Sequence, residues 1–387
     1  MIPLAIPNLT GNEARYLHEC IESTFVSSIG PFVTRFEEMV AQAAQARYAV
    51  ATSAGTTGLH AALTALGVGR DDVVILQALT FIASANAIAH CGATPWLCDV
   101  AAESWTLDVT QLADVLRHQT EARGGIRVHR PSGRRVAAIM PVYTLGMPAD
   151  MDALMDTAHR YGLPVVADAA AALGARYKGR AIADLGADLT VFSFNGNKTV
   201  TAGGGGVVAG NDEALCRRVR HLTTTARRGA EYDHDMVGFN YRMTNLQAAV
   251  GCAQLEQLET FVAAKRRIAQ RYNDALRPLP GVGLFPRPGW AEGACWFSGI
   301  TLTHPPVAEV MPLLRAREVD SRPFWKPIHL QVPYASVPRA PLPVSDRVWD
   351  TILTLPCSTA LTEDEQGTVI AAVGEAVRRG VTNEEKT

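Results

Sequence analysis

The sequence predicts an α/β protein with a mostly parallel sheet and a ligand site at the carboxyl ends of its strands. Short apolar runs alternate with helical patterns from Tyr48 to Gly206, which is typical of βαβ units. Two of these runs end in polar side chains, Asp168 and Ser193, and Lys198 follows soon after the second. Because ligands of such sheets bind beyond the carboxyl ends of the strands, we expect these side chains to share one site.

The expected elements follow the chain in order. Short apolar runs between turn signals predict strands at Tyr48–Thr52, Asp72–Leu76, Thr94–Val100, Val136–Tyr143, Leu163–Ala167, Leu189–Ser193, Val207–Ala209 and Trp296–Leu302. Helical periodicity predicts helices over Phe32–Ala46, Leu59–Leu66, Thr80–Ile88, Leu107–Leu116, Asp150–Tyr161, Asn245–Phe261, Lys265–Leu276, Val307–Arg317 and Glu363–Arg378. Before them, a capping box at Thr10–Glu13 predicts an N-terminal helix that buries Leu17, Cys20 and Ile21.

Length and composition limit the class of protein. The chain has 387 residues, 48% apolar and 19% charged, as expected for a globular protein with one large and one small domain. We predict a large domain of residues 1–255, which includes the N-terminal helices, and a smaller α+β domain of residues 256–387. The net charge of −2 argues against nucleic acid and acidic membranes as partners.

Targeting and cysteine patterns predict a cytoplasmic protein. The sequence shows no long apolar run and no signal peptide at its start. Its seven cysteines contain no C-x-x-C pair. We therefore expect reduced thiols and no metal site.

A turn of small residues, Ser53–Gly58, follows the first strand and opens a helix. This geometry suits an anion, because free backbone N–H groups and the helix dipole point at it. An ordinary strand-to-helix turn with hydroxyl caps explains the turn equally well. Phe81, near the start of the next helix, is either a face for a planar cofactor or a core residue.

Lys198 and Asp168 together suit pyridoxal phosphate. The lysine forms a Schiff base with the aldehyde of this cofactor, and the carboxylate keeps its ring nitrogen protonated. Taken singly, each residue is more often a solvated charge or a cap at a strand end. The glycines at 203–206 and the turn at Ser53–Gly58 favour the cofactor site.

A basic insert at residues 123–135 precedes one of the expected strands. Its Pro-Ser-Gly sequence at 131–133 predicts a small hairpin. The charge of this insert fits either a solvated face or a contact with the diphosphate of a nucleotide.

Motifs along nearly the whole chain resemble the DegT/DnrJ/StrS family of pyridoxal-phosphate-dependent sugar aminotransferases. They lie at residues 9–13, 25–28, 53–57, 80–81, 168–206, 238–243, 322–329 and 355–359. The string from Ser193 to Lys198 with its glycine run is the most specific. Together with the basic insert, it looks most like the branch that aminates C4 of UDP-4-keto-6-deoxy-N-acetylhexosamines in bacillosamine and legionaminic acid pathways.

The resemblance implies a fold-type I aminotransferase that moves the amino group of L-glutamate to the keto carbon of a nucleotide-linked 4-keto-6-deoxy sugar. Lys198 is implied to be the Schiff-base lysine and proton carrier, Asp168 to pair with the ring nitrogen, and Phe81 to stack on the ring. The phosphate is implied to be held by Thr56, Thr57, Ser193 and, from a second subunit, Asn240. This last role implies a homodimer with shared active sites.

The resemblance also implies that Arg322, Trp325 and His329 approach the nucleotide sugar. Two positions depart from the family pattern: Ala171 stands where Gln or Glu is usual, and Tyr143 where His is usual. Since both lie near the chemistry, we expect Tyr143 to belong to the substrate site.

Three alternatives remain open from the sequence. A dehydratase of the same family would carry His in place of the lysine, so Lys198 argues against it. An aminotransferase acting on another ketone or aldehyde, such as a cyclitol or sugar acid, is the second. A non-catalytic sensor that kept the fold is the third, and Ala171 and Tyr143 are the features that favour it.

Overall fold

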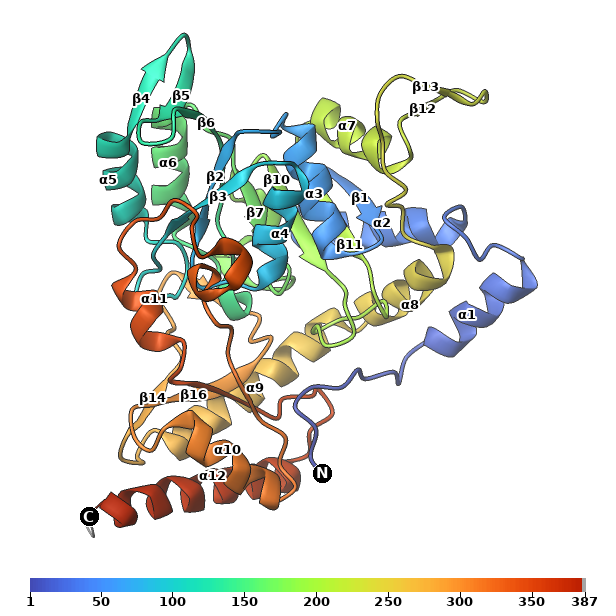
Figure 1. Cartoon of the computed structure of the whole chain (residues 1–387). Helices are drawn as coiled ribbons and strands as arrows, with labels where there is room; N and C mark the ends of the chain where they lie inside the picture. Colours follow the sequence, from blue (N-terminus) through green and yellow to red (C-terminus); the bar gives the residue numbers. More distant parts are fainter. Residues whose placement is uncertain (385–387) are drawn as a thin grey trace.

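The computed structural model describes residues 1–384 and consists of two sheets with covering helices (Figure 1). The helices that pack on the larger sheet or beside it are α1 (Glu13–Glu22), α2 (Pro31–Ala44), α3 (Gly55–Ala65), α4 (Ile82–His90), α5 (Val109–Gln119), α6 (Met151–Tyr161), α7 (Glu213–Thr223), α8 (Asn245–Leu255) and α11 (Pro343–Val348). Within residues 1–384, no helix has both the length and the apolar character needed to cross a membrane.

The larger sheet is continuous and mostly parallel, as predicted. Its order is β3 (Thr94–Cys98), β2 (Val73–Gln77), β6 (Arg134–Met140), β7 (Val166–Asp168), β10 (Leu189–Ser193), β11 (Gly206–Gly210) and β1 (Tyr48–Thr52). Parallel bridges from Ile139 to Val165 and from Val142 to Asp168 join β6 to β7. In this sheet β11 runs in the opposite direction to the other strands, so it pairs antiparallel with both β1 and β10.

Both faces of the larger sheet are buried, which explains its nearly continuous apolar strands. Along β2, Val73 and Ile75 belong to one buried cluster, whereas Val74 and Leu76 belong to another. The first cluster includes side chains of α2, α5, α6 and α8, and the second includes side chains of α3, α4 and α7. This sandwich fixes the sheet rigidly, so the carboxyl ends of its strands make a stable platform.

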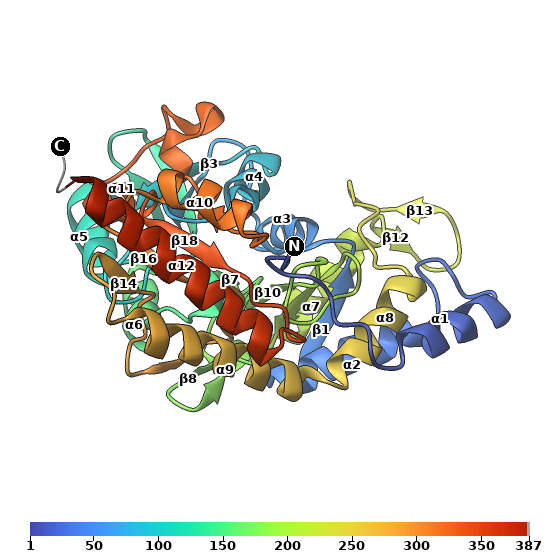
Figure 2. The ribbon, with the colours of Figure 1, turned by 90° about the horizontal axis from the view of Figure 1, so that it is seen from below.

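The smaller sheet is antiparallel and lies at the C-terminal end of the chain, as expected for an α+β unit. Its order is β14 (Val282–Leu284), β16 (Ser298–Leu302), β18 (Ile352–Leu355) and β17 (Arg322–Pro323). Its core includes side chains of α9 (Leu258–Leu276), α10 (Val307–Ala316) and α12 (Glu363–Glu384). Figure 2 shows α9 and α12 lying side by side. The proposed boundary at residue 255 coincides with the end of α8, just before α9.

The first residues of the chain pack beside the smaller sheet, although they precede the helices of the larger one. Ile2 pairs with Val319, and the carbonyl oxygen of Leu4 accepts a hydrogen bond from the Cys357 backbone at 2.8 Å. Helix α1 begins at Glu13, but the expected hydroxyl cap is wrong because the Thr10 hydroxyl donates to the Asn8 side chain. The expected burial of Ile21 is also wrong: this side chain is 64% exposed.

The basic insert forms two successive hairpins, from β4 (Thr120–Arg123), β5 (Ile126–His129) and the start of β6. The hairpin predicted at residues 131–133 is confirmed. Figure 1 shows the insert projecting at the end of the molecule opposite α12. It precedes β6 and therefore lies at the amino edge of the larger sheet, away from the carboxyl ends. Two small sheets contain the remaining strands. One has three strands, in the order β15 (Ala291–Glu292), β8 (Arg176–Tyr177) and β9 (Arg180–Ala181), and the other pairs β12 (Arg227–Arg228) with β13 (Asp233–His234).

Candidate active site

A cavity of about 730 Å³ lies at the carboxyl edge of the larger sheet and is closed on its other side by the smaller sheet. Its wall includes the turn after β1, the ends of β7 and β10, residues of β17 and the N-terminal segment 3–6. The convergence predicted from the strand ends is therefore present in the structure. The predicted residues that border the cavity are Thr56, Phe81, Tyr143, Asp168, Ser193, Lys198, Arg322 and Trp325.

Asp168 is the last residue of β7 and is 4% exposed. One carboxyl oxygen, Oδ2, accepts a hydrogen bond of 2.7 Å from the Ser84 hydroxyl on α4, and Oδ1 accepts one of 3.1 Å from the Ala170 backbone. Burial raises the pKa of Asp168, while the two hydrogen bonds and the Lys198 charge oppose that rise. A buried carboxylate with fixed donors is suited to pair with a cationic ring nitrogen.

Lys198 lies in the turn that follows β10, closed by a 2.9 Å hydrogen bond from its own N–H to the Asn195 carbonyl. Its Nζ atom stands 3.5 Å from the ring centroid of Trp296. Burial lowers the pKa of Lys198 to about 8, and the charge of Asp168 opposes the shift. An amine with this pKa is neutral far more often near neutral pH than an ordinary lysine, which favours its use as a nucleophile or proton carrier.

The turn after β1 presents the N-terminus of α3 to the cavity. A Cβ atom added to Gly55 would lie 3.0 Å from that of Ser193, and one added to Gly206 would lie 2.6 Å from the Ala54 backbone. The glycines thus let the turn, β10 and β11 approach closely. Thr56 borders the cavity, but the Thr57 hydroxyl accepts from the Ala54 N–H at 3.0 Å and donates to the Ala54 carbonyl at 2.8 Å. Thr57 shapes the turn without reaching the cavity wall.

Aromatic side chains form the outer wall of the cavity. Phe81 is 52% exposed, so it is not the core residue that one interpretation expected. Its ring centroid lies 5.8 Å from that of Trp325, which in turn lies 5.9 Å from Trp296. Flat rings of substrate or cofactor can stack on such surfaces.

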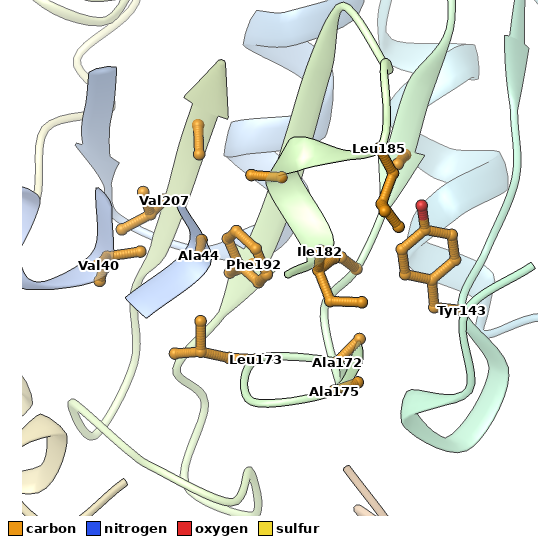
Figure 3. Packing of buried hydrophobic residues seen from close by; sticks show 14 of the residues in the cluster. Val40, Ala44, Tyr143, Ala172, Leu173, Ala175, Ile182, Leu185, Phe192 and Val207 are labelled. Atoms are coloured by element: carbon orange, nitrogen blue, oxygen red, sulfur yellow. The ribbon is translucent and has the colours of Figure 1, made fainter. Parts of the chain in front are cut away.

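Two predicted substrate-site residues have buried side chains, although Tyr143 borders the cavity. The Tyr143 ring packs in the core beside Ile182 and Leu185 (Figure 3), where burial raises the pKa of its phenol. Its hydroxyl has no hydrogen-bond partner in the part of the chain that the structure describes. His329 is 8% exposed and lies outside the cavity wall, with Nε2 2.7 Å from the Asp346 carboxylate. The geometry therefore does not support a substrate contact by either side chain.

Arg322 and Asn240 occupy different surfaces. Arg322 is exposed on β17 and borders the cavity, with its guanidinium 3.9 Å from the Asp320 carboxylate. Asn240 is exposed, lies outside the cavity of its own chain and pairs with Thr224.

Several residues of the cavity wall were not predicted from the sequence, including Asn195, Asn197, Trp296 and Asp320. Ser84, which lies outside the wall and donates a hydrogen bond to Asp168, was not predicted either. Ser84 carried a weak signal, since it is a polar residue one turn after Thr80. No sequence signal pointed to Trp296, because it reaches Lys198 from the smaller sheet. Ala171 borders the cavity, so the departure from the family pattern leaves open space there.

These residues fit pyridoxal phosphate by the chemistry of their side chains. The cavity brings together an amine with a lowered pKa, a buried carboxylate, an exposed aromatic face and the first turn of a helix. Asp168 would hold the ring nitrogen, Phe81 the ring face, and Thr56 and Ser193 with the α3 N-terminus the phosphate.

Known proteins resemble this chain over nearly its whole length. GDP-perosamine synthase of Caulobacter vibrioides is 37% identical over 384 residues, covering 97% of this chain and 98% of the relative. GDP-perosamine synthase of Vibrio cholerae is 34% identical over 372 residues, covering 94% and 96%. The solved structure of DesV from S. venezuelae, in complex with a ketimine intermediate, superposes with a TM-score of 0.86 at 31% identity, covering 95% of both chains.

The family model of the DegT/DnrJ/EryC1/StrS aminotransferases matches residues 7–374. A second solved member, from Brucella abortus, superposes with a TM-score of 0.85 at 27% identity and covers 95% of both chains. The chain belongs to the DegT/DnrJ/EryC1/StrS aminotransferase family and is a pyridoxal-phosphate-dependent transaminase.

Proposed function

We propose that this transaminase moves the amino group of L-glutamate to C4 of a nucleotide-linked 4-keto-6-deoxy sugar. The observation that carries the proposal is the meeting of Lys198 and Asp168 in one cavity that also presents a cation and aromatic rings. The names of two relatives also support the proposal. Both are GDP-perosamine synthases, and perosamine is a 4-amino sugar, carried here on a nucleotide.

The side chains divide the chemistry between them. When bound, pyridoxal phosphate supplies an electron-withdrawing ring that stabilises negative charge on the carbon losing its proton. Asp168 keeps the ring nitrogen protonated and so maintains that withdrawal. Lys198, whose pKa is lowered to about 8, removes a proton at one carbon and returns it at another, as a general base and then an acid.

The outer part of the cavity suits a nucleotide sugar. Its volume of about 730 Å³ falls within the range of small-molecule sites. Arg322 offers a guanidinium for the phosphates, and Trp325 offers a flat face for a ring. Asn195 and Asn197 border the cavity near Lys198 and offer amide groups to sugar hydroxyls.

Two observations support a dimer with shared active sites. Apolar side chains are exposed at Ile21 in α1, at Phe25 and Ile29 between α1 and α2, and again at Tyr232 and Val237 near β13. These two regions lie on the same side of the molecule in Figures 1 and 2. We infer that this surface meets a second copy, and that Asn240 reaches the phosphate of the partner's cofactor.

A panel of nucleotide keto-sugars tests the proposed acceptor. The purified enzyme is first mixed with L-glutamate, and the visible absorbance of its cofactor reports loading with the amino group. GDP-linked and UDP-linked 4-keto-6-deoxy sugars, including the N-acetylated UDP forms, are then offered, with Lys198→Ala as the control. We expect glutamate-dependent amination of at least one of them. Loading by glutamate without amination of any nucleotide sugar, but with amination of a cyclitol ketone or sugar acid, would refute the proposal.

A further inference from the structure

The amine of Lys198 rests on the face of an indole. Its Nζ atom is 3.5 Å from the ring centroid of Trp296, well within the distance at which a cation is attracted to the negative face of the ring. Trp296 is 4% exposed and borders the cavity just before β16. The smaller sheet therefore supplies a direct partner for a lysine that belongs to the larger one.

Trp296 is held firmly in this position. Its Nε1 donates a 2.7 Å hydrogen bond to the carbonyl oxygen of Asn197, the residue before Lys198. Its own carbonyl oxygen accepts a 3.0 Å hydrogen bond from Nζ of Lys265, which also donates to the Cys357 carbonyl at 2.6 Å. The indole further stacks on Phe297 with a centroid distance of 4.1 Å. Because these contacts fix both the backbone and the ring, the indole is an organised surface.

The groups around Lys198 act on the protonation of its amine. Asp168, Asp320 and Arg322 are the other charged residues on the described wall of the cavity, and Lys265 lies behind Trp296. Asp168 acts on Lys198 from the end of β7 and favours its charged form, against the effect of burial. The indole face favours the charged form as well. Lys198 thus has one carboxylate partner and one aromatic partner.

We propose that Trp296 is a positioning residue that seats the side chain of Lys198 whenever the lysine is not joined to the cofactor. A transaminase lysine must leave the cofactor and still remain within reach of the substrate carbon for proton transfer. The indole provides a place for the amine beside the cavity and stabilises the ammonium form that returns the proton. This inference rests on transamination itself and not on which acceptor the enzyme uses.

Lys198 reactivity in Trp296→Phe and Trp296→Leu tests the proposal. Each enzyme is loaded directly with pyridoxamine phosphate, so that Lys198 is free and no substrate is needed. Competitive labelling with acetic anhydride at a series of pH values, followed by mass spectrometry of the Lys198 peptide, measures its pKa. Loss of the ring face should lower this pKa by roughly 0.5 to 1.5 pH units in Trp296→Leu and by less in Trp296→Phe. Trp349→Phe, a residue outside the cavity wall, is the matched control and should leave it unchanged.

The possible results separate positioning from a structural role. In the supporting result the pKa of Lys198 is highest in the wild type, lower in Trp296→Phe and lowest in Trp296→Leu. The pH profile of kcat then shifts in the same direction, while KM stays within about twofold. An unchanged Lys198 pKa with only a lower melting temperature would show that Trp296 merely fills space. A higher pKa in Trp296→Leu would show that the indole acts by excluding water. Either of these two results overturns the proposal, and neither depends on the nucleotide sugar.

Discussion

The Ser84 hydroxyl on α4 donates a 2.7 Å hydrogen bond to Oδ2 of Asp168 at the end of β7. This contact favours the carboxylate form against burial, which raises the pKa of Asp168. In Ser84→Ala the pKa should rise further, by about one unit, because a hydrogen bond to a charged group contributes roughly 1.5 to 3 kcal/mol. We expect the acid limb of the kcat profile to move to higher pH.

The matched control for Ser84→Ala is Thr80→Val. Thr80 lies 3.0 Å from the Ser84 hydroxyl and makes no direct contact with the carboxylate. Thr80→Val should therefore shift the acid limb of the kcat profile less than Ser84→Ala does. An acid limb that stays in place in Ser84→Ala would mean that Asp168 does not control this part of the profile.

The stability of the cofactor-free protein should depend on pH through Lys198. Burial lowers the pKa of this amine from 10.5 to about 8, so the unfolded chain binds the proton more tightly than the folded protein. Stability from this group is therefore lowest below about pH 8 and rises as the pH approaches 10.5. Relative to Lys198→Met, the wild type should gain roughly 2 kcal/mol across that window, a value reduced because Lys198 as a whole is only partly buried.

Urea unfolding at a series of pH values measures the difference between the wild type and Lys198→Met. Using the difference cancels the titration of other groups. A constant difference between pH 8 and 10.5 would show that the amine titrates normally in the folded protein.

The sequence predicted the strands of the larger sheet better than it predicted the side-chain contacts around the cavity. β1 and β10 have the predicted bounds, because a strand that is buried on both faces needs an uninterrupted apolar run. The resemblance implied that Thr57 holds the phosphate, whereas in the structure its hydroxyl donates a hydrogen bond to the Ala54 carbonyl of the same turn. Trp296 could not be predicted, since only the packing of the smaller sheet brings it to Lys198.

Tyr143→Phe should be harmless. The hydroxyl is buried without a partner among the described residues, so its removal leaves no donor or acceptor unsatisfied. We expect the free energy of unfolding to stay equal or increase by up to about 1 kcal/mol, and kcat/KM to stay within about twofold. Tyr143→Ala should instead lose about 3 to 5 kcal/mol, as large cavities in cores do. A large loss of activity in stable Tyr143→Phe would place the hydroxyl back in the chemistry.

Arg322 and His329 lie in one sequence motif but should differ in function. Arg322→Gln removes the exposed guanidinium on the cavity wall, and KM for the nucleotide sugar should rise by about 10-fold or more. His329→Gln breaks the contact with Asp346 outside the cavity, so it should lower the melting temperature and leave KM nearly unchanged. Steady-state kinetics and thermal unfolding of both variants check the pair. Equal effects on KM would contradict the placement of His329.

Mixing two inactive variants tests whether active sites are shared between subunits. Asn240 is exposed and lies outside its own cavity, and we propose that it holds the phosphate in the partner's site. Asn240→Asp should be inactive because the new carboxylate repels the phosphate, and Lys198→Ala should be inactive because the amine is missing. In a mixed dimer, one site carries both substitutions and the other carries neither. Random exchange of subunits should therefore restore about a quarter of the wild-type activity.

The restored activity should appear only after subunit exchange, for example after mild denaturation and refolding of the mixture. Lys198→Ala mixed with a second lysine variant, Lys198→Met, is the matched control and should stay inactive. If each site used the Asn240 of its own chain, both sites of the mixed dimer would carry one inactivating substitution. Complete lack of activity in a mixture shown by native mass spectrometry to contain mixed dimers would therefore assign Asn240 to its own subunit.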